Sequence, residues 1–211
     1  MTGPSSIEFV KMEGIGNDYI FIDALDHTSA TARLVLERGL NPRWIQQISD
    51  RHYGVGSDGV VAIVPPVNGR NQARMQMWNA DGSPSAMCGN ALRCIALYMH
   101  IKLGLDGLVV ESETADHACQ VHDYDSGSGS AIVRIDMGAP RFEAALIPFT
   151  GAGQAVTSRI ADVALLQEIP IQLPASGLAY QASLVSMGNP HCVIFCPDAD
   201  AIDLQTVGPL L

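Results

Sequence analysis

Short segments in which apolar and polar residues alternate recur along the chain, separated by turns rich in glycine, asparagine and aspartate. A two-residue period is typical of β-strands with one buried face, and a short continuous apolar run is typical of a fully buried strand. The pattern therefore predicts strands at residues 7–12, 19–23, 60–64, 74–78, 108–112, 118–122, 131–137, 147–149, 179–187 and 191–196.

Two segments show helical spacing instead. The clearer one begins at Cys88, and its apolar residues between 91 and 103 fall on one helical face. A shorter helix is expected to end near Asp50, because Asn41 and Pro42 offer an N-cap residue followed by proline at the first helical position.

Residues 125–130 read Asp-Ser-Gly-Ser-Gly-Ser. Such a run of small polar residues suits either a flexible domain linker or a hairpin loop. A hairpin loop is favoured, because predicted strands of similar length flank it.

The composition of the 211-residue chain is that of a folded protein, with 47% hydrophobic and 16% charged residues. This length allows one large domain or two small ones. The formal net charge is −10, and the 12 lysines and arginines are scattered. Nucleic-acid-binding proteins usually carry a basic patch, so we expect no nucleic-acid partner. A substrate carboxylate would need local backbone N–H groups or an arginine to hold it.

The cysteine usage points to a reducing compartment. Residues 1–6 lack the basic and apolar regions of a secretory signal, and the cysteine count is odd. The longest apolar runs are too short to cross a bilayer. We therefore expect free thiols in a cytoplasmic protein that does not enter a membrane; the cysteines are Cys88, Cys94, Cys119, Cys192 and Cys196.

The sharpest chemical feature is Cys88-Gly89-Asn90 at the predicted helix start. The positive end of a helix dipole favours a thiolate, and the unpaired N–H groups of the first turn bind carboxylates. One turn could thus hold a carboxylate and aim a sulfur at the adjacent carbon. A free cysteine is more often a small buried apolar residue, but the Gly-Asn pair favours function here. Cys94 lies within the helical pattern and is expected in the core.

A second feature is the segment from Ser186 to Cys192, in which a strand ends in a turn carrying Asn189 and His191. The histidine could adjust or accept the proton of a thiol. Taken alone, a single histidine before a strand is more often structural. Asn17 and Asn79 also lie in turns, where an asparagine usually bonds its own backbone.

Five segments, in order, resemble signature blocks of the diaminopimelate epimerase family, and together they span most of the chain from residue 7 onward. One block alone would be weak evidence, whereas five in order are highly specific. The blocks are Met12–Tyr19, Asp50–Gly59, Asn79–Ser83, Cys88–Cys94 and Met187–Cys192.

The resemblance implies an isomerase that interconverts LL- and meso-diaminopimelate for lysine and peptidoglycan synthesis. Such enzymes place two cysteines on opposite faces of the α-carbon and use neither cofactor nor metal. By motif, Cys88 resembles the first catalytic cysteine, and His191 resembles the histidine that adjusts thiol acidity. The substrate-binding positions implied in the same way are Asn17, Asn79, Gly89, Asn90 and Asn189.

The resemblance also implies an α+β fold of two pseudo-symmetric lobes, each a curved antiparallel sheet around a central helix. The N-terminal lobe with the first catalytic cysteine would be residues 1–136, and a partial C-terminal lobe would be residues 137–211. The site would lie in the cleft between them and take a small amino-acid substrate. The sequence leaves a homodimer open.

One departure from the family concerns the second catalytic cysteine. In the family it lies downstream, in a block with a following glycine and hydroxyl residue. Neither Cys192 nor Cys196 is followed in this way. We therefore expect a C-terminally truncated chain with an incomplete second lobe, which would epimerise inefficiently and fold less well at its open edge. Gly59 stands where some relatives have a substrate-contacting side chain, so it receives no such role.

Four alternatives remain at this point. A related two-cysteine isomerase, such as a proline racemase or a phenazine-pathway isomerase, would differ only in substrate. A thiol hydrolase would use Cys88 as nucleophile and His191 as base. A metal site around Cys192 and Cys196 is thinly supported, since paired cysteine knuckles are absent. A non-catalytic binding protein would explain the missing cysteine, although truncation explains it more simply.

Overall fold

The structure is a computed structural model that describes residues 6–143, 146–147, 157–160, 163–166, 169–173 and 178–210. It divides into two compact units, Met1–Met137 and Gly138–Leu211. Each unit is described by itself. Their identity as an N-terminal lobe and a partial C-terminal lobe, divided after residue 136, remains a prediction.

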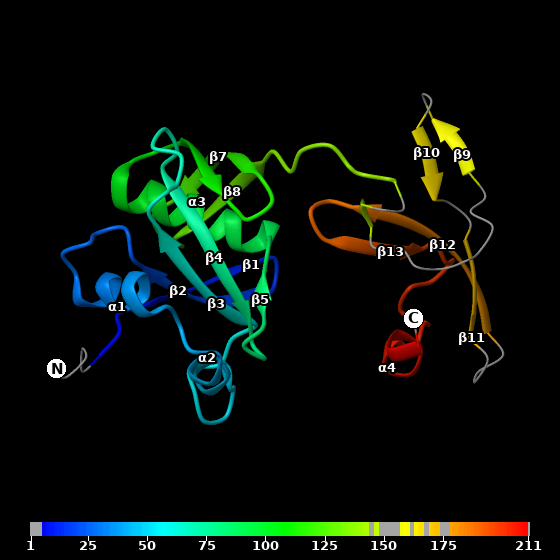
Figure 1. The fold of residues 1–211 in the computed structure, drawn as a ribbon, viewed down its shortest axis with the longest axis horizontal. Helices are drawn as coiled ribbons and strands as arrows, with labels where there is room; N and C mark the ends of the chain where they lie inside the picture. The colour runs from blue at the N-terminus through cyan, green and yellow to red at the C-terminus, as the bar shows by residue number, and fades with distance from the viewer. Residues whose placement is uncertain are drawn as a thin grey trace. The chain divides into compact units, whose positions relative to one another are not determined.

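The first unit is built on one sheet in the order β1-β2-β3-β4-β6-β7-β8, with the short strand β5 paired to β4 (Figure 1). All seven strands predicted between residues 7 and 137 are present, with bounds shifted by a few residues. The strands are β1 Val10–Gly14, β2 Asn17–Asp23, β3 Gly59–Val64, β4 Ala73–Asn79, β5 Pro84–Ser85, β6 Gly107–Glu111, β7 Asp116–Asp125 and β8 Ser130–Ile135.

The sheet is mixed rather than purely antiparallel as the resemblance implied. β2 pairs with β3 in parallel, and β4 pairs with β6 in parallel. Parallel neighbours need a crossover connection, and helices supply both of them. The first contains α1 (Ala30–Arg38) and α2 (Pro42–Ser49), and the second contains α3 (Gly89–Leu103). The fold is therefore α+β.

Helices cover both faces of the sheet, as can be followed in Figure 1. Alternate residues of β2 show the division: Tyr19 and Phe21 pack towards α3, whereas Ile20 and Ile22 pack towards α1 and α2. The central strand β3 is buried at every position, because a strand covered on both faces has no polar side. This explains why its sequence is a continuous apolar run.

Both predicted helix starts are confirmed. Cys88 is the N-cap of α3, and Gly104 ends that helix in the left-handed conformation at φ 70°. At α2 the side chain of Asn41 accepts a hydrogen bond from the backbone N–H of Arg43, and Pro42 occupies the first helical position. The Asn41 side chain and the Gly104 N–H satisfy backbone groups that a helix end would otherwise leave unpaired, whereas the Cys88 side chain makes no capping bond.

The sequence interpretation missed α1. Its buried residues are only Thr31, Ala32 and Val35, so its apolar stripe is too sparse to stand out. The sequence signal that could have identified α1 is the pair of capping residues at its two ends. Ser29 accepts from the Ala32 N–H at 2.9 Å, and Gly39 follows the last helical residue at φ 68°.

The small-residue run at 125–130 is a hairpin loop, as predicted. Asp125 pairs with Ser130 in the register of β7 and β8. The Asp125 carboxylate accepts bonds from the Gly127 N–H and the Ser128 hydroxyl, which close the turn. The run therefore connects neighbouring strands within the first unit.

The second unit contains two antiparallel sheets among its described residues, in the orders β10-β9 and β11-β12-β13. The strands predicted at 179–187 and 191–196 correspond to β12 and β13, whereas the one at 147–149 lies largely outside the described residues. The elements are β9 Thr157–Ile160, β10 Val163–Leu166, β11 Ile169–Leu173, β12 Leu178–Ser186, β13 Pro190–Ile194, α4 Leu204–Val207 and the 3₁₀ helix η2 Gly208–Leu210.

Over the described part of the chain, every helix is too short or too polar to cross a membrane.

Candidate active site

The start of α3 holds a half-buried thiol beside open backbone donors. Cys88 has extended φ and ψ of −148° and 112°, and its side chain makes no capping bond. The first hydrogen bond inside the helix runs from the Leu92 N–H to the Cys88 carbonyl at 3.0 Å. The N–H groups of residues 89–91 precede this bond and point outward from the helix end. They can receive an anion next to the sulfur.

The packing around position 89 does not require a glycine there. A Cβ added there would meet only the terminal sulfur and methyl of Met137, both at 3.6 Å, which is ordinary contact. Glycine costs helix stability relative to alanine, so its presence needs another reason. Close approach of a ligand to the first-turn N–H groups is such a reason.

A chain of hydrogen bonds joins Asn90 to the β1–β2 turn. The Asn90 Nδ2 donates to Asn17 Oδ1 at 2.6 Å, and the Asn17 Nδ2 donates to Asp58 Oδ2 at 3.1 Å. At the far end, the Arg93 guanidinium donates to Asn90 Oδ1. A carboxylate only accepts and a guanidinium only donates. The two charged ends therefore fix which way both amide groups face.

Two basic side chains bind the carboxylates at the acidic end of this series of hydrogen bonds. Arg51 Nη2 lies 2.6 Å from Asp18 Oδ1 and 2.8 Å from Asp58 Oδ1, and Lys11 Nζ lies 2.8 Å from Asp18 Oδ2. The hydrogen bonds from Arg51 and then Lys11 hold the pKa of the Asp18 carboxyl well below its usual range. The turn before β3 is thus tied to β1 and β2 through ionised groups.

The β1–β2 turn fits closely against the start of α3. Ile15 and Gly16 both have positive φ, of 53° and 83°, as a two-residue hairpin turn requires. A Cβ on Gly14 would lie 2.9 Å from the Asn90 carbonyl oxygen, so only glycine fits there. Ile15 is a β-branched residue in a conformation that glycine or asparagine normally adopts, which indicates local strain.

Asn79 lies at the same end of the sheet as Asn17. Gly59 pairs with Tyr19 on one side and with Asn79 on the other. The Asn79 Nδ2 donates to the Ser83 hydroxyl at 3.0 Å, so its amide closes its own turn. A Cβ on Gly59 would lie 2.3 Å from the Trp78 carbonyl oxygen, which accounts for glycine at that position.

Asn189 and His191 belong to the second unit, where Asn189 lies in the turn between β12 and β13 and His191 lies at the start of β13. The His191 Nδ1 is 3.0 Å from the Asn189 carbonyl oxygen, and Gly188 between strands β12 and β13 has φ 103°. Both side chains are exposed. Their roles beside Cys88 remain predictions.

The five cysteines are free and differ in environment. Burial raises the pKa of Cys94 to about 12 and that of Cys119 to about 11, so both remain protonated at neutral pH. Cys94 is a core residue, as predicted. Cys192 is exposed as a residue, and partial desolvation of its thiol raises its pKa above the ordinary value.

The sequence interpretation missed two residues that contact the predicted site. Tyr19 is buried, and its hydroxyl lies 3.3 Å from Cys88 Sγ. Asp58 receives the Asn17 amide described above. Strand alternation places Tyr19 on the face that α3 covers, but a contact between residues 69 positions apart carries no local signal.

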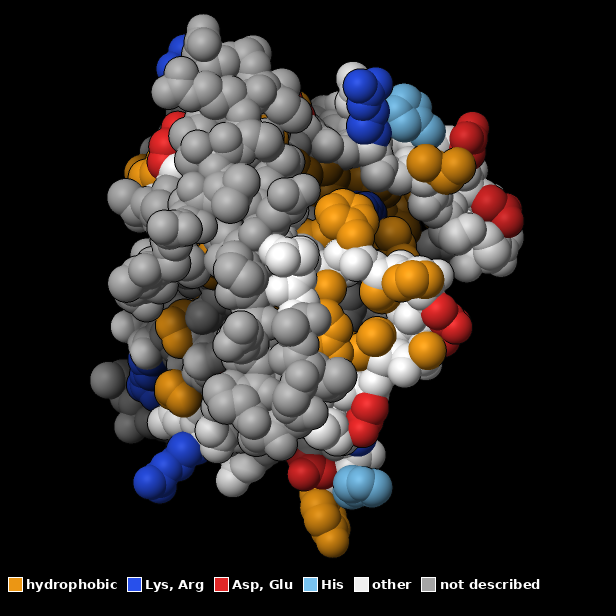
Figure 2. All heavy atoms as spheres, turned by 90° about the vertical axis from the view of Figure 1, so that its right-hand side faces the viewer, with side chains coloured by type: hydrophobic (Ala, Val, Ile, Leu, Met, Phe, Trp, Pro, Cys, Tyr) orange, Lys and Arg blue, Asp and Glu red, His pale blue; other side chains and the backbone are white. Residues whose placement is uncertain are grey.

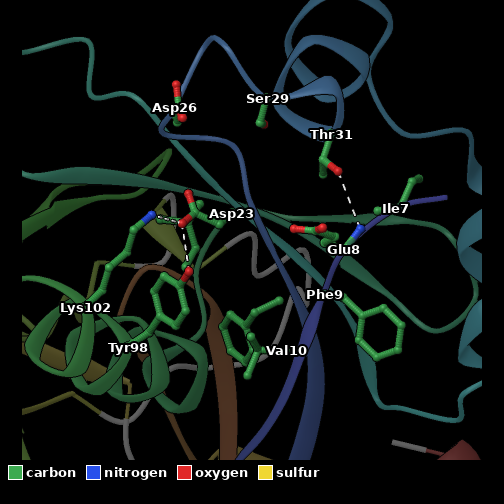
Figure 3. A pocket seen from close by; sticks show the side chains of 12 residues that line it. Ile7, Glu8, Phe9, Val10, Asp23, Asp26, Ser29, Thr31, Tyr98 and Lys102 are labelled. Carbon is green, nitrogen blue, oxygen red and sulfur yellow. Dashed lines mark hydrogen bonds and ion pairs between the residues drawn. The ribbon is translucent and has the colours of Figure 1, made fainter. Parts of the chain in front are cut away.

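A cavity of about 650 Å³ lies away from Cys88 (Figure 3). Its polar lining residues include Asp23, Tyr98 and Lys102, and the Tyr98 hydroxyl donates to Asp23 Oδ2 at 2.7 Å. Lys102 stands near the C-terminal end of α3, whose 15 residues span about 22 Å. The cavity therefore belongs to the opposite end of the helix from the thiol.

One face of the molecule shows how the described basic side chains are distributed on it (Figure 2). On the face drawn in Figure 2, lysine and arginine side chains form separate groups rather than one continuous patch.

Comparison with known sequences gives a consistent result. Residues 9–143 match the family model described as diaminopimelate epimerase. The diaminopimelate epimerase of Leptospira biflexa is 36% identical over 207 residues, which cover 97% of this chain and 66% of that protein. The corresponding protein of Desulfovibrio desulfuricans is 36% identical over 220 residues, covering 97% and 65%. The chain thus spans slightly less than two thirds of these relatives.

Solved structures share the fold at lower identity. A predicted epimerase from Pseudomonas aeruginosa superposes with a TM-score of 0.57 at 15% identity, covering 96% of this chain and 66% of that one. A probable proline racemase from Agrobacterium radiobacter gives a TM-score of 0.58 at 11% identity, covering 96% and 53%. At these identities the likeness concerns the fold alone.

Proposed function

This chain belongs to the diaminopimelate epimerase family, and on that premise we propose that it inverts one α-carbon of diaminopimelate, interconverting the LL and meso stereoisomers. The observation that carries the proposal is the thiol of Cys88 at the start of α3, beside first-turn N–H groups without a side-chain cap. The relatives named above bear the name of this activity. The family match covers 135 residues, from 9 to 143.

The first chemical step is removal of the α-proton by the Cys88 thiolate. The carbon–hydrogen bond breaks, a sulfur–hydrogen bond forms, and the electron pair stays on the α-carbon and its carboxylate. Donors already aimed at the carboxylate stabilise this charge without reorganising during the reaction. The N–H groups of Gly89 and Asn90 would serve as those donors. A proton taken from solvent on the opposite face forms the new carbon–hydrogen bond and inverts the centre, and the Cys88 thiol then releases its proton to solvent.

Substrate recognition is proposed for the asparagines around this helix end. The amides of Asn17 and Asn90 are held in fixed orientation between Asp58 and Arg93, so their remaining hydrogen-bonding capacity is directed before a substrate arrives. Such preorganisation lowers the cost of binding. Asn79, which the β-sheet register places at the same edge, is proposed as a further contact.

The second unit is proposed to supply Asn189 to the substrate and His191 to the acid–base chemistry. Both are exposed in the described structure and lie two positions apart where the turn meets β13, which suits contact with a ligand. We also propose that the protein works in the cytoplasm, in agreement with its five free thiols, and needs no cofactor.

Conversion of LL-diaminopimelate to the meso form, followed by chiral chromatography, tests the proposal. Cys88→Ser should lower the rate by roughly 10²–10⁴-fold, the usual contribution of a general acid–base group. Cys94→Ser is the matched control, because it changes a core cysteine of the same helix and leaves the chemistry in place.

Assays with other amino acids and with acyl substrates separate the remaining alternatives. Racemisation of proline or another amino acid, without reaction of diaminopimelate, would replace the substrate while keeping the reaction class. Acyl transfer to Cys88 from a thioester or ester would instead favour a thiol hydrolase and overturn the proposal.

A further inference from the structure

Tyr19 presents a buried hydroxyl to the sulfur on which the proposed reaction depends. Its side chain is only 4% exposed, and it lies in the core between the sheet and α3. The hydroxyl is 3.3 Å from Cys88 Sγ. Within the described residues, that sulfur is the hydrogen-bond partner of the hydroxyl. A buried hydroxyl without a partner would be costly, so this contact is part of the native packing.

The local structure leaves both atoms available to each other. The Cys88 side chain is not used for capping, which leaves its sulfur free to receive a donor. The Tyr19 ring is fixed by β2, whose register pairs Tyr19 with Met12 and Gly59, and by an edge-on contact with Phe21 at 6.2 Å between ring centroids. The hydroxyl is therefore directed at the helix start by rigid elements.

We propose that Tyr19 is a positioning residue that donates its hydroxyl hydrogen bond to the Cys88 thiolate and so increases the fraction of reactive sulfur at neutral pH. The inference rests on the proposed role of Cys88 as the acid–base group. The proton stays on the tyrosine oxygen, because burial, with a further contribution from the neighbouring Cys88, raises the pKa of Tyr19 above its ordinary value. A hydrogen bond to the charged form of a group favours that form.

Other charged or titratable groups approach this end of the unit from the neighbouring elements. They are Glu13 of β1, Asp58 before β3, and Arg93 and Cys94 of α3. The carboxylates oppose a thiolate and the guanidinium favours it. A substitution that removes only the tyrosine oxygen leaves all of these contributions in place, so its effect reports on the hydroxyl alone.

The test is the pH dependence of Cys88 alkylation by iodoacetamide, followed by mass spectrometry of the peptide that contains it. Tyr19→Phe should move the midpoint of the profile upward by about one pH unit and slow alkylation at pH 7 roughly tenfold. Tyr98→Phe is the matched control, because it also removes a tyrosine hydroxyl that bonds a side chain, Asp23, but at the far end of α3. Its profile should coincide with that of the unaltered chain.

A second variant guards against a folding defect in Tyr19→Phe. Incorporation of 2,3-difluorotyrosine at position 19 retains the ring and makes the hydroxyl a stronger donor, so the midpoint should move downward. An unchanged midpoint in both Tyr19→Phe and the fluorinated protein would overturn the inference.

The alkylation assay does not need a substrate, which separates the two proposals. If the profile moves as expected but diaminopimelate is never converted, the hydroxyl contact stands and the proposed function fails. If conversion proceeds and the profile of Tyr19→Phe is unchanged, the proposed function stands and the role of Tyr19 is rejected.

Discussion

Asn17 Oδ1 accepts a 2.6 Å hydrogen bond from Asn90 Nδ2, although the two residues are 73 positions apart in the sequence. The bond joins the β1–β2 turn to the first turn of α3. The Asn17 Nδ2 donates to the Asp58 carboxylate, and the Asn90 Oδ1 accepts from the Arg93 guanidinium. Neither amide group can therefore turn over without losing a hydrogen bond to a charged group. Two of the four predicted substrate-binding asparagines, Asn17 and Asn90, thus form one oriented pair.

Asp58→Asn tests this orientation. An asparagine can donate as well as accept, so the Asn17 amide is no longer held in one direction. Loss of a hydrogen bond to a charged group corresponds to about 1.5–3 kcal/mol, and the KM for diaminopimelate should rise roughly tenfold or more, with a smaller fall in kcat. Steady-state kinetics measures both. Asp26→Asn, at an exposed turn carboxylate, is the control and should leave both constants in place; equal KM values for the two variants would contradict the account.

Gly89→Ala should separate stability from function. The added methyl has room beside Met137, and alanine is the better helix former, so thermal unfolding should occur at the same or a higher temperature. The same methyl stands where a carboxylate would approach the first-turn N–H groups, so substrate affinity should fall. Calorimetry and a binding titration measure the two effects. A variant that binds diaminopimelate as tightly as the unaltered chain would remove the helix start as the carboxylate site.

Gly14→Ala should disturb both properties together. The new Cβ would lie 2.9 Å from the Asn90 carbonyl oxygen, and backbone on both sides limits relief, so we expect a loss of about 1–3 kcal/mol of stability. The shifted helix start should also lower the conversion rate. Gly107→Ala, on strand β6 with open space around it, is the matched control for denaturant unfolding. Similar losses in the two variants would show that the close fit at Gly14 is unimportant.

The ionised network around Asp18 should make stability depend on acid pH. The folded-state pKa of Asp18 is lowered by Arg51 and then Lys11, so its contribution is fully present above the unfolded value near 3.8 and is lost progressively as pH falls from there through the much lower folded-state pKa. Asp18→Asn should therefore destabilise the protein by about 1 kcal/mol at pH 7, and the difference should become smaller at about pH 2–3. Urea unfolding at the two pH values measures this; a difference that is undiminished in acid would assign the effect to something other than charge.

Much of the first unit could be predicted because its signals are local. Alternation identifies the strands, and the caps Asn41 and Cys88 with the apolar face from Leu92 to Leu103 identify two of its helices. The parallel pairings of β2 with β3 and β4 with β6 could not be obtained in this way, because pairing direction depends on crossovers between distant segments. The helix α1 was missed because few of its residues are buried.

The candidate site likewise contains residues that local sequence signals identify and residues that they do not. Cys88, Gly89 and Asn90 are recognisable because they sit together at one helix start. Tyr19 and Asp58 are not, since each reaches the site through a long-range contact that no spacing in the sequence encodes.

The central claim is that Cys88 exchanges the α-proton of diaminopimelate with solvent. The most direct measurement is proton NMR of diaminopimelate in heavy water with the 211-residue chain, its Cys88→Ser variant and its Cys94→Ser variant. The account predicts loss of the α-proton signal with the unaltered chain and with Cys94→Ser, and none above background with Cys88→Ser. Exchange that continues undiminished in Cys88→Ser would contradict it.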